Sequence, residues 1–177
     1  MKTNKYLLKI SIFLLCVLCL TVSAEAQRRK KPTKTTAAAT TANAATNAEI
    51  KEGAGKVSIQ LKNVSKFIYN LAIIGRSIED LDVEIKAGKV SPKGIETNKK
   101  NKQAVLSGLR NLRAGLAALE VEFRTKPSLK TYTSQIQGIA DLCGQAEDLA
   151  AAGKFLESGR PLLLAVEKLS DTLVAMP

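Results

Sequence analysis

Apolar residues recur every three or four positions through most of residues 57–176, and this period constrains the fold more than any other feature. It matches the 3.6-residue turn of an α-helix with one buried face. The first such stripe contains Val57, Leu61, Val64, Ile68, Leu71, Ile74, Ile78, Leu81 and Ile85. The strict alternation, Asn-Gly turns and aromatic residues that are typical of strands are absent or few. We therefore expect an all-α domain.

Turn signals divide the stripes into four expected helices. Their approximate bounds are 56–87, 92–125, 128–152 and 155–175. Gly88 can adopt the left-handed conformation that ends a helix, and Ser91 followed by Pro92 is a typical helix start. The first helix starts near Lys56, because Gly53 and Gly55 lower the helix propensity before it. Pro161 is either a first-turn proline or a kink in the last helix.

Short connections favour antiparallel neighbours, so residues 51–177 are predicted to form a single four-helix, up-down-up-down bundle. The second helix carries leucines at matched positions of two seven-residue units, which is typical of a coiled-coil seam. Gly108 and Gly115 lie seven residues apart beside this seam. They predict either close packing against the first helix near Gly75, or a contact with a second copy. Monomer and homodimer both remain open.

The N-terminus has the pattern of a secretory signal. Lysines precede an apolar run over residues 10–22, which as a helix spans about 20 Å. A bilayer core of about 30 Å needs a longer run, so no transmembrane span is expected in the mature chain. Small residues then favour cleavage after Ala26, or after Ala24. We predict a signal peptide over residues 1–26 and a secreted or periplasmic protein.

A basic block, Arg28, Arg29, Lys30 and Lys31, directly follows this run. Flanking cations favour the cytoplasmic side, so an uncleaved signal that anchors the chain to the membrane is the alternative. Residues 27–50 are then basic and rich in Thr and Ala, with little apolar surface to bury. We predict a disordered linker there.

The excess positive charge lies mostly outside the expected bundle. The chain has 27 basic and 16 acidic residues, a net charge of +11. Setting aside the signal peptide and the linker, with its five cations and Glu49, leaves only +5 on residues 51–177. Ten cations in the linker and around the first turn are candidate contacts for an anionic surface. They are Arg28, Arg29, Lys30, Lys31, Lys86, Lys89, Lys93, Lys99, Lys100 and Lys102. No aromatic residue interleaves them, so nucleic acid is not an expected partner.

The chain contains no histidine, which excludes His-activated nucleophiles, His-based zinc sites and the Glu/His di-iron sites of helical bundles. Cleavage of the signal would remove Cys16 and Cys19 and leave Cys143 alone, too few for thiolate clusters. No cofactor or metal site is expected. Cys143 lies on an apolar stripe, where it is either a buried inert thiol or the donor of an intermolecular disulfide.

Acidic residues cluster at 79–84 and 141–148, on the face away from each stripe or at its edge. Paired acids catalyse only when they face each other in a shielded site, so no enzymatic activity is expected. We expect an exported, non-catalytic helical protein of the cell envelope or secreted fraction, which binds a protein partner or a surface. One alternative is a basic module for an anionic envelope polymer or membrane surface, bound through the tail and the Lys86–Lys102 tip. The other is a small ligand carrier or enzyme with a pocket between helices.

Overall fold

The structure is a computed structural model that describes the backbone of residues 36–177 and the side chains of residues 43–177. This part of the chain is all-helical, as predicted, and has no strand. Its elements are α2 (Thr36–Lys86), α3 (Pro92–Thr125), the 3-10 helix η1 (Pro127–Tyr132), α4 (Thr133–Ile136), α5 (Ile139–Ala151) and α6 (Gly159–Ala175). The expected signal peptide, the basic block Arg28–Lys31 and the rest of residues 27–35 lie outside the described residues.

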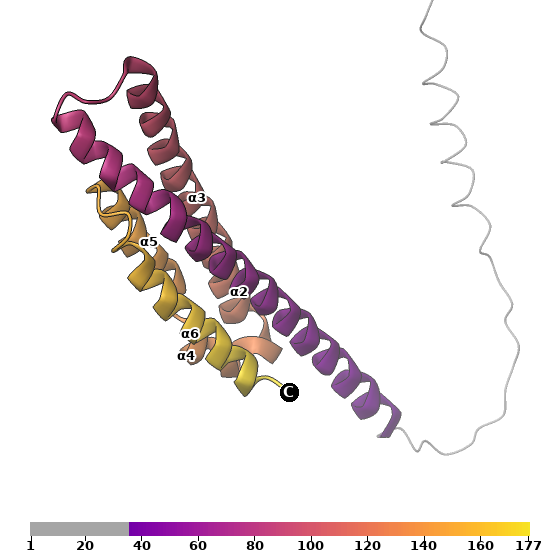
Figure 1. Ribbon diagram of the computed structural model, residues 1–177. Coiled ribbons are helices and arrows are strands. Elements are labelled where there is room, and N and C mark those ends of the chain that lie inside the picture. The colour runs from indigo at the N-terminus through magenta and orange to yellow at the C-terminus, as the bar shows by residue number, and fades with distance from the viewer. Residues whose placement is uncertain (1–35) are drawn as a thin grey trace, which may run out of the picture. The chain divides into compact units, whose positions relative to one another are not determined.

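The first helix starts much earlier than expected. Residues 36–50 belong to α2, so the prediction of a disordered linker was wrong for this segment. Alanine has the highest helix propensity, and an existing helix is extended at little cost per residue. Side chains 43–49 are exposed, so backbone hydrogen bonding supports most of this extension. Its end contacts the rest of the fold, where Ile50 packs against the core and Glu49 accepts a hydrogen bond from Oγ of Ser128 at 2.6 Å. In Figure 1 the extension is the indigo end of α2, which runs on past the C-terminal end of α6.

Two glycines that were expected to weaken this region lie inside α2, in different surroundings. A Cβ atom on Gly53 would lie 2.8 Å from Cδ2 of Leu129 and 3.4 Å from Cε of Met176. The missing side chain therefore lets η1 and the end of α6 pack directly against the α2 backbone. A Cβ atom on Gly55 would meet nothing within 4 Å.

The turn between α2 and α3 has the expected caps. Gly88 has a φ of 71°, and the amide of Lys89 donates to the carbonyl of Glu84 at 3.0 Å. This arrangement satisfies a carbonyl at the end of α2, where no further turn of helix can do so. Oγ of Ser91 accepts a hydrogen bond from the amide of Gly94 at 3.3 Å. α3 then covers the predicted range.

The third expected helix is broken into η1, α4 and α5, so the prediction of one helix over residues 128–152 was wrong. The chain leaves helical geometry at Gln137, whose ψ is 134°, and Gly138 has a φ of 89°. The apolar stripe nevertheless stays buried across the break, as at Ile136 and Ile139. Hydrophobic periodicity therefore identified the core side of this segment but not its change of direction.

The last helix starts at Gly159, later than the expected residue 155, and Pro161 lies in its first turn. The chain before it is a turn in which Oγ of Ser158 donates to the carbonyl of Phe155 at 2.6 Å. Phe155 is buried against α2, where a Cβ atom on Gly75 would lie 3.2 Å from Cβ of Phe155. Gly75 thus accommodates the α5–α6 turn, and not α3 as expected.

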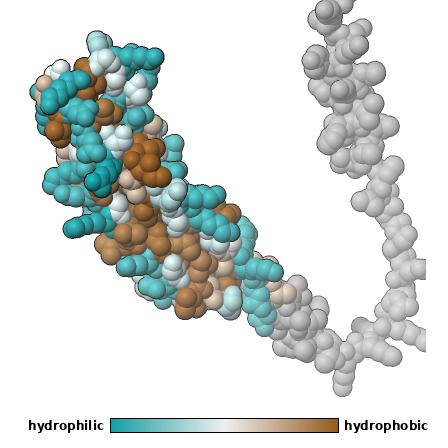
Figure 2. All heavy atoms as spheres, in the orientation of Figure 1, coloured by the Kyte–Doolittle hydropathy of each residue, from teal (hydrophilic) through white to brown (hydrophobic). Residues whose placement is uncertain are grey.

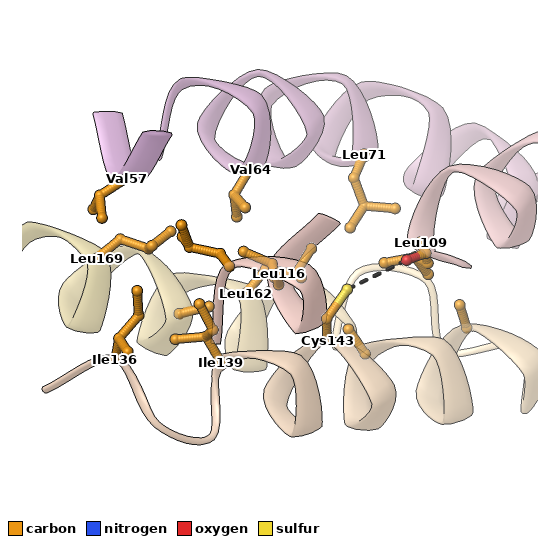
Figure 3. Packing of buried hydrophobic residues seen from close by; sticks show 14 of the residues in the cluster. Val57, Val64, Leu71, Leu109, Leu116, Ile136, Ile139, Cys143, Leu162 and Leu169 are labelled. Atoms are coloured by element: carbon orange, nitrogen blue, oxygen red, sulfur yellow. Dashed lines mark hydrogen bonds between the residues drawn. The ribbon is translucent and has the colours of Figure 1, made fainter. Parts of the chain in front are cut away.

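α2 packs against α3 and α6, and α5 packs against the same two helices. Figure 3 shows Val57, Val64 and Leu71 of α2 pointing toward Leu116, Leu162 and Leu169 across a common core. The glycines of α3 face α2: a Cβ atom on Gly108 would lie 2.5 Å from Cε2 of Phe67, and one on Gly115 would lie 3.0 Å from Nε2 of Gln60. The seam glycines therefore serve contacts within the chain.

Candidate functional site

A polar network joins α2 and α3 close to their connecting turn. The side chain of Asn98 is 1% exposed, and its Nδ2 donates to Oδ1 of Asp82 at 2.7 Å. Nζ of Lys102 forms an ion pair of 2.6 Å with the same carboxylate oxygen. Oδ1 of Asn98 has no hydrogen-bond partner. The network holds this end of the hairpin together. It also neutralises Lys102, one of the ten cations expected to contact an anionic surface.

The other lysines of the expected tip differ in their partners. Lys100 pairs with Glu96 at 2.7 Å, and both side chains are largely exposed. Lys86, Lys89, Lys93 and Lys99 are exposed, and none has an ion pair with another described residue. Four of the six tip lysines therefore carry a charge that no direct ion pair neutralises.

Some acids of the two clusters, and Glu120 outside them, hold elements together. A carboxylate oxygen of Glu79 accepts from the amide of Leu156, and one of Glu120 accepts from the amide of Ala140, each at 3.0 Å. Glu147 on α5 pairs with Nε of Arg110 on α3 at 2.7 Å. Within the described residues, no group of acidic or cysteine side chains could hold a metal ion.

A four-residue ion-pair network joins α2 to the end of α3. Nζ of Lys56 contacts Glu122 at 2.7 Å and Glu52 at 2.8 Å, and Nζ of Lys126 contacts Glu122 at 2.7 Å. Burial disfavours the charged form of Glu122, but hydrogen bonds from Lys126 and Lys56 outweigh it and lower the pKa of this carboxyl. The hydrogen bond from Lys56 likewise lowers the pKa of Glu52. The network therefore stabilises both carboxylates in their ionised form.

Cys143 is fully buried, and its Sγ donates to the carbonyl of Leu109 at 3.4 Å (Figure 3). Burial raises the pKa of this thiol to about 11. A neutral, enclosed thiol is a poor nucleophile. The intermolecular disulfide considered above stays a prediction, and the position of Cys143 argues against it.

An open groove of about 390 Å³ lies between α2 and α3. Gly108 and Gly115 form part of its lining, together with Phe67 and amide side chains such as Asn63 and Asn111. The amide side chains can donate and accept hydrogen bonds, and the amine of Lys66 also lines the groove.

The solvent-facing side of α2 combines apolar and basic side chains. We call it the α2 outer face, and it consists of Ile59, Lys62, Lys66, Tyr69, Ile73 and Arg76. Ile59 is 56% exposed, Tyr69 70% and Ile73 59%. Lys62, Lys66 and Arg76 are exposed, and none forms an ion pair with another described residue. Figure 2 shows apolar and hydrophilic side chains side by side on the surface of the described unit.

The sequence interpretation missed this face, because it followed the buried stripe and the lysines around the turn. The signal was nonetheless present: no acidic residue occurs between Glu52 and Glu79, and in that interval Ile59, Tyr69 and Ile73 fall outside the core stripe. An interval with only positive charge and apolar residues on the polar side of a helix indicates a contact surface.

No family model, no curated protein and no solved structure matches this chain. Within the described residues, no helix is both long enough and apolar enough to cross a lipid bilayer.

Proposed function

We propose that this chain is an exported, non-catalytic helical protein of the cell envelope or secreted fraction that binds an anionic partner through its α2–α3 hairpin. In this proposal the four long helices form one up-down-up-down antiparallel bundle, and residues 1–26 direct export. The bundle holds the α2–α3 hairpin in place, and this hairpin is the side that binds the partner.

The observation that carries this proposal is the distribution of unpaired charge. Lys62, Lys66 and Arg76 lie in an interval of α2 without any acidic residue, and they have no ion-pair partner among the described residues. The exposed tip lysines, such as Lys89 and Lys93, form a second group of unpaired cations, separated from the first along α2 by the acids at 79–84. Uncompensated cations on one side of a protein attract anionic surfaces and accelerate association.

The carboxylates support a binding role over an enzymatic one. Glu79 and Glu120 accept hydrogen bonds from backbone amides, and Glu147 pairs with Arg110. Each of these acids is committed to holding helices or turns together. A general acid or base would need to face a substrate with its proton-transferring oxygen accessible.

The test is retention of the natively processed protein on heparin resin and on anionic vesicles along a salt gradient. Three variants each remove three positive charges: Lys62→Gln/Lys66→Gln/Arg76→Gln on α2, Lys86→Gln/Lys89→Gln/Lys93→Gln at the tip, and Lys130→Gln/Arg160→Gln/Lys168→Gln in the C-terminal half. We expect the first to elute at clearly lower salt and the third to behave as wild type. Equal losses in all three, or no retention of wild type, would overturn the proposal. A loss confined to the tip variant would move the binding side to the turn.

A further inference from the structure

We infer that the anionic partner is a lipid bilayer surface, and that the α2 outer face lies on it. Ile59, Tyr69 and Ile73 would enter the headgroup region, while Lys62, Lys66 and Arg76 would contact lipid phosphates. This inference rests on the proposed function, because it names the partner that the positive hairpin binds.

The geometry of α2 gives this face its direction. Val57, Val64, Leu71 and Ile78 are buried in the core and recur every seven residues along one side of the helix. The residues of the α2 outer face recur at steps of three or four on the other side. Since α3 and α6 both pack against α2, they flank the helix and leave this side directed outward.

The exposed apolar residues favour a membrane over a charged polymer. Two isoleucines and a tyrosine, each more than half exposed, lie within about four helical turns of each other. A polyanion would pair with the cations but leave these side chains in water. A bilayer interface accepts both, since an interfacial helix buries its apolar residues at the acyl boundary while its cations contact anionic headgroups. Tyrosine suits this boundary, with an apolar ring and a polar hydroxyl.

Charge complementarity points to the same occupant. The α2 outer face is bounded by Glu52 on one side and by Glu79 and Asp80 on the other, with only positive charge between them. The negative potential at an anionic leaflet strengthens membrane binding by about fivefold for each cation near the surface. Two shallow hollows lie along this face. One lies beside Lys66 and Tyr69, and the other, beside Ile73 and Arg76, is also lined by Asp80 and Glu84 at the acidic end of the face.

A single tryptophan reports directly on insertion, because the chain has no tryptophan of its own. We expect Tyr69→Trp to shift its emission to shorter wavelength with phosphatidylglycerol-containing vesicles, and to be quenched by brominated lipids. Phosphatidylcholine vesicles should produce neither effect. The matched control is Val121→Trp, which places the probe at a 52% exposed position on α3 and should not respond. Equal responses from both probes would overturn the inference.

Vesicle sedimentation separates this inference from the proposed function. We expect Ile59→Ser/Ile73→Ser to lower affinity for anionic vesicles at least about tenfold, from the lost apolar burial, without changing retention on heparin. Val121→Ser/Leu164→Ser, which also removes two exposed apolar residues, should bind as wild type. Normal vesicle binding by the isoleucine variant, or retention on heparin without vesicle binding, would overturn the lipid inference and leave the proposed function standing. Loss of all charge-dependent binding in the wild type would overturn both. Circular dichroism checks that each variant is folded.

Discussion

Nδ2 of Asn98 donates to Oδ1 of Asp82 across the α2–α3 hairpin at 2.7 Å, and this contact joins the two helices close to the turn that connects them. The same carboxylate neutralises Lys102. A single acid therefore serves as the partner of a buried amide and of a cation. Removing it leaves both groups without their partner in the folded state.

We expect Asp82→Ala to lower the free energy of unfolding by about 1–3 kcal/mol, because a buried polar group loses its hydrogen bond. Hydrogen exchange should accelerate most in residues 79–102. Asp80→Ala, which changes a neighbouring exposed acid, is the control and should stay within about 0.5 kcal/mol of wild type. Similar losses in both variants would show that local charge, and not the contact with Asn98, is responsible.

Two glycines within one turn of α2 should respond in opposite directions to the same substitution. Gly53→Ala places a methyl group against the end of the buried Leu129 side chain. This overpacking costs about 1–3 kcal/mol and is partly offset by a helix-propensity gain of up to about 1 kcal/mol, so the fold should be destabilised by up to about 2 kcal/mol. Gly55→Ala meets open space and should stabilise it by up to about 1 kcal/mol through helix propensity. Urea unfolding followed by circular dichroism measures both. A stabilising Gly53→Ala would contradict the described packing of η1 on α2.

The thiol of Cys143 should be unreactive in the native protein. With Cys16 and Cys19 replaced by alanine in any unprocessed material, we expect a thiol reagent at pH 8 to modify the native chain at least about 100-fold more slowly than the denatured chain, since the pKa is about 11 and the sulfur is buried. Non-reducing gels should show monomer. A disulfide-linked dimer of folded protein would contradict the structure around Cys143.

Acid should remove the contribution of the Glu52–Lys56–Glu122–Lys126 network. The pKa values of both glutamates are lowered in the folded state from an ordinary value of 4.5. Their contribution is therefore present above pH 4.5 and is lost as the pH falls through the folded-state pKa. We expect Glu122→Gln to cost about 1 kcal/mol at pH 7 and less at pH 3. Thermal unfolding between pH 3 and pH 7 measures the difference, and Asp148→Asn, at an exposed acid, should show no such trend.

Export is tested by fusing residues 1–35 to alkaline phosphatase, which is active only outside the reducing cytoplasm. We expect active enzyme, and N-terminal sequencing should give Gln27 or Glu25 as the first residue. Arg28→Gln/Arg29→Gln/Lys30→Gln/Lys31→Gln should leave activity unchanged if export is already complete, and raise it if these cations retain the chain. An inactive fusion in both forms would contradict export.

The core of this fold was accessible from the sequence, whereas its breaks were not. Val64, Leu116 and Leu169 fall on the predicted stripes and are fully buried, because burial follows the 3.6-residue period directly. The break at Gly138 was missed, because the apolar spacing of Ile136 and Ile139 is the same in a straight helix and in a bent one. Only the backbone angles distinguish the two.

The candidate site was harder to predict for a different reason. The lysines around the turn were identified as a group, but Lys102 proved to be paired with Asp82, which lies on another helix. A sequence does not tell which charges meet across helices. The α2 outer face was overlooked because the sequence does not show which apolar residues of α2 are exposed. The exposure of Ile59, Tyr69 and Ile73 depends on where α3 and α6 pack against the helix.

Since α2 continues as one helix from Thr36 into the bundle, the segment 36–50 fixes rotation as well as distance. Each residue of an α-helix turns the chain by about 100°, and seven residues make almost two complete turns. A one-residue insertion between Thr36 and Ile50 would swing whatever precedes it to another side of the bundle, whereas a seven-residue insertion would nearly restore the original alignment. The number of residues in this segment, more than their composition, thus sets the rotation about the helix axis between Thr36 and the bundle.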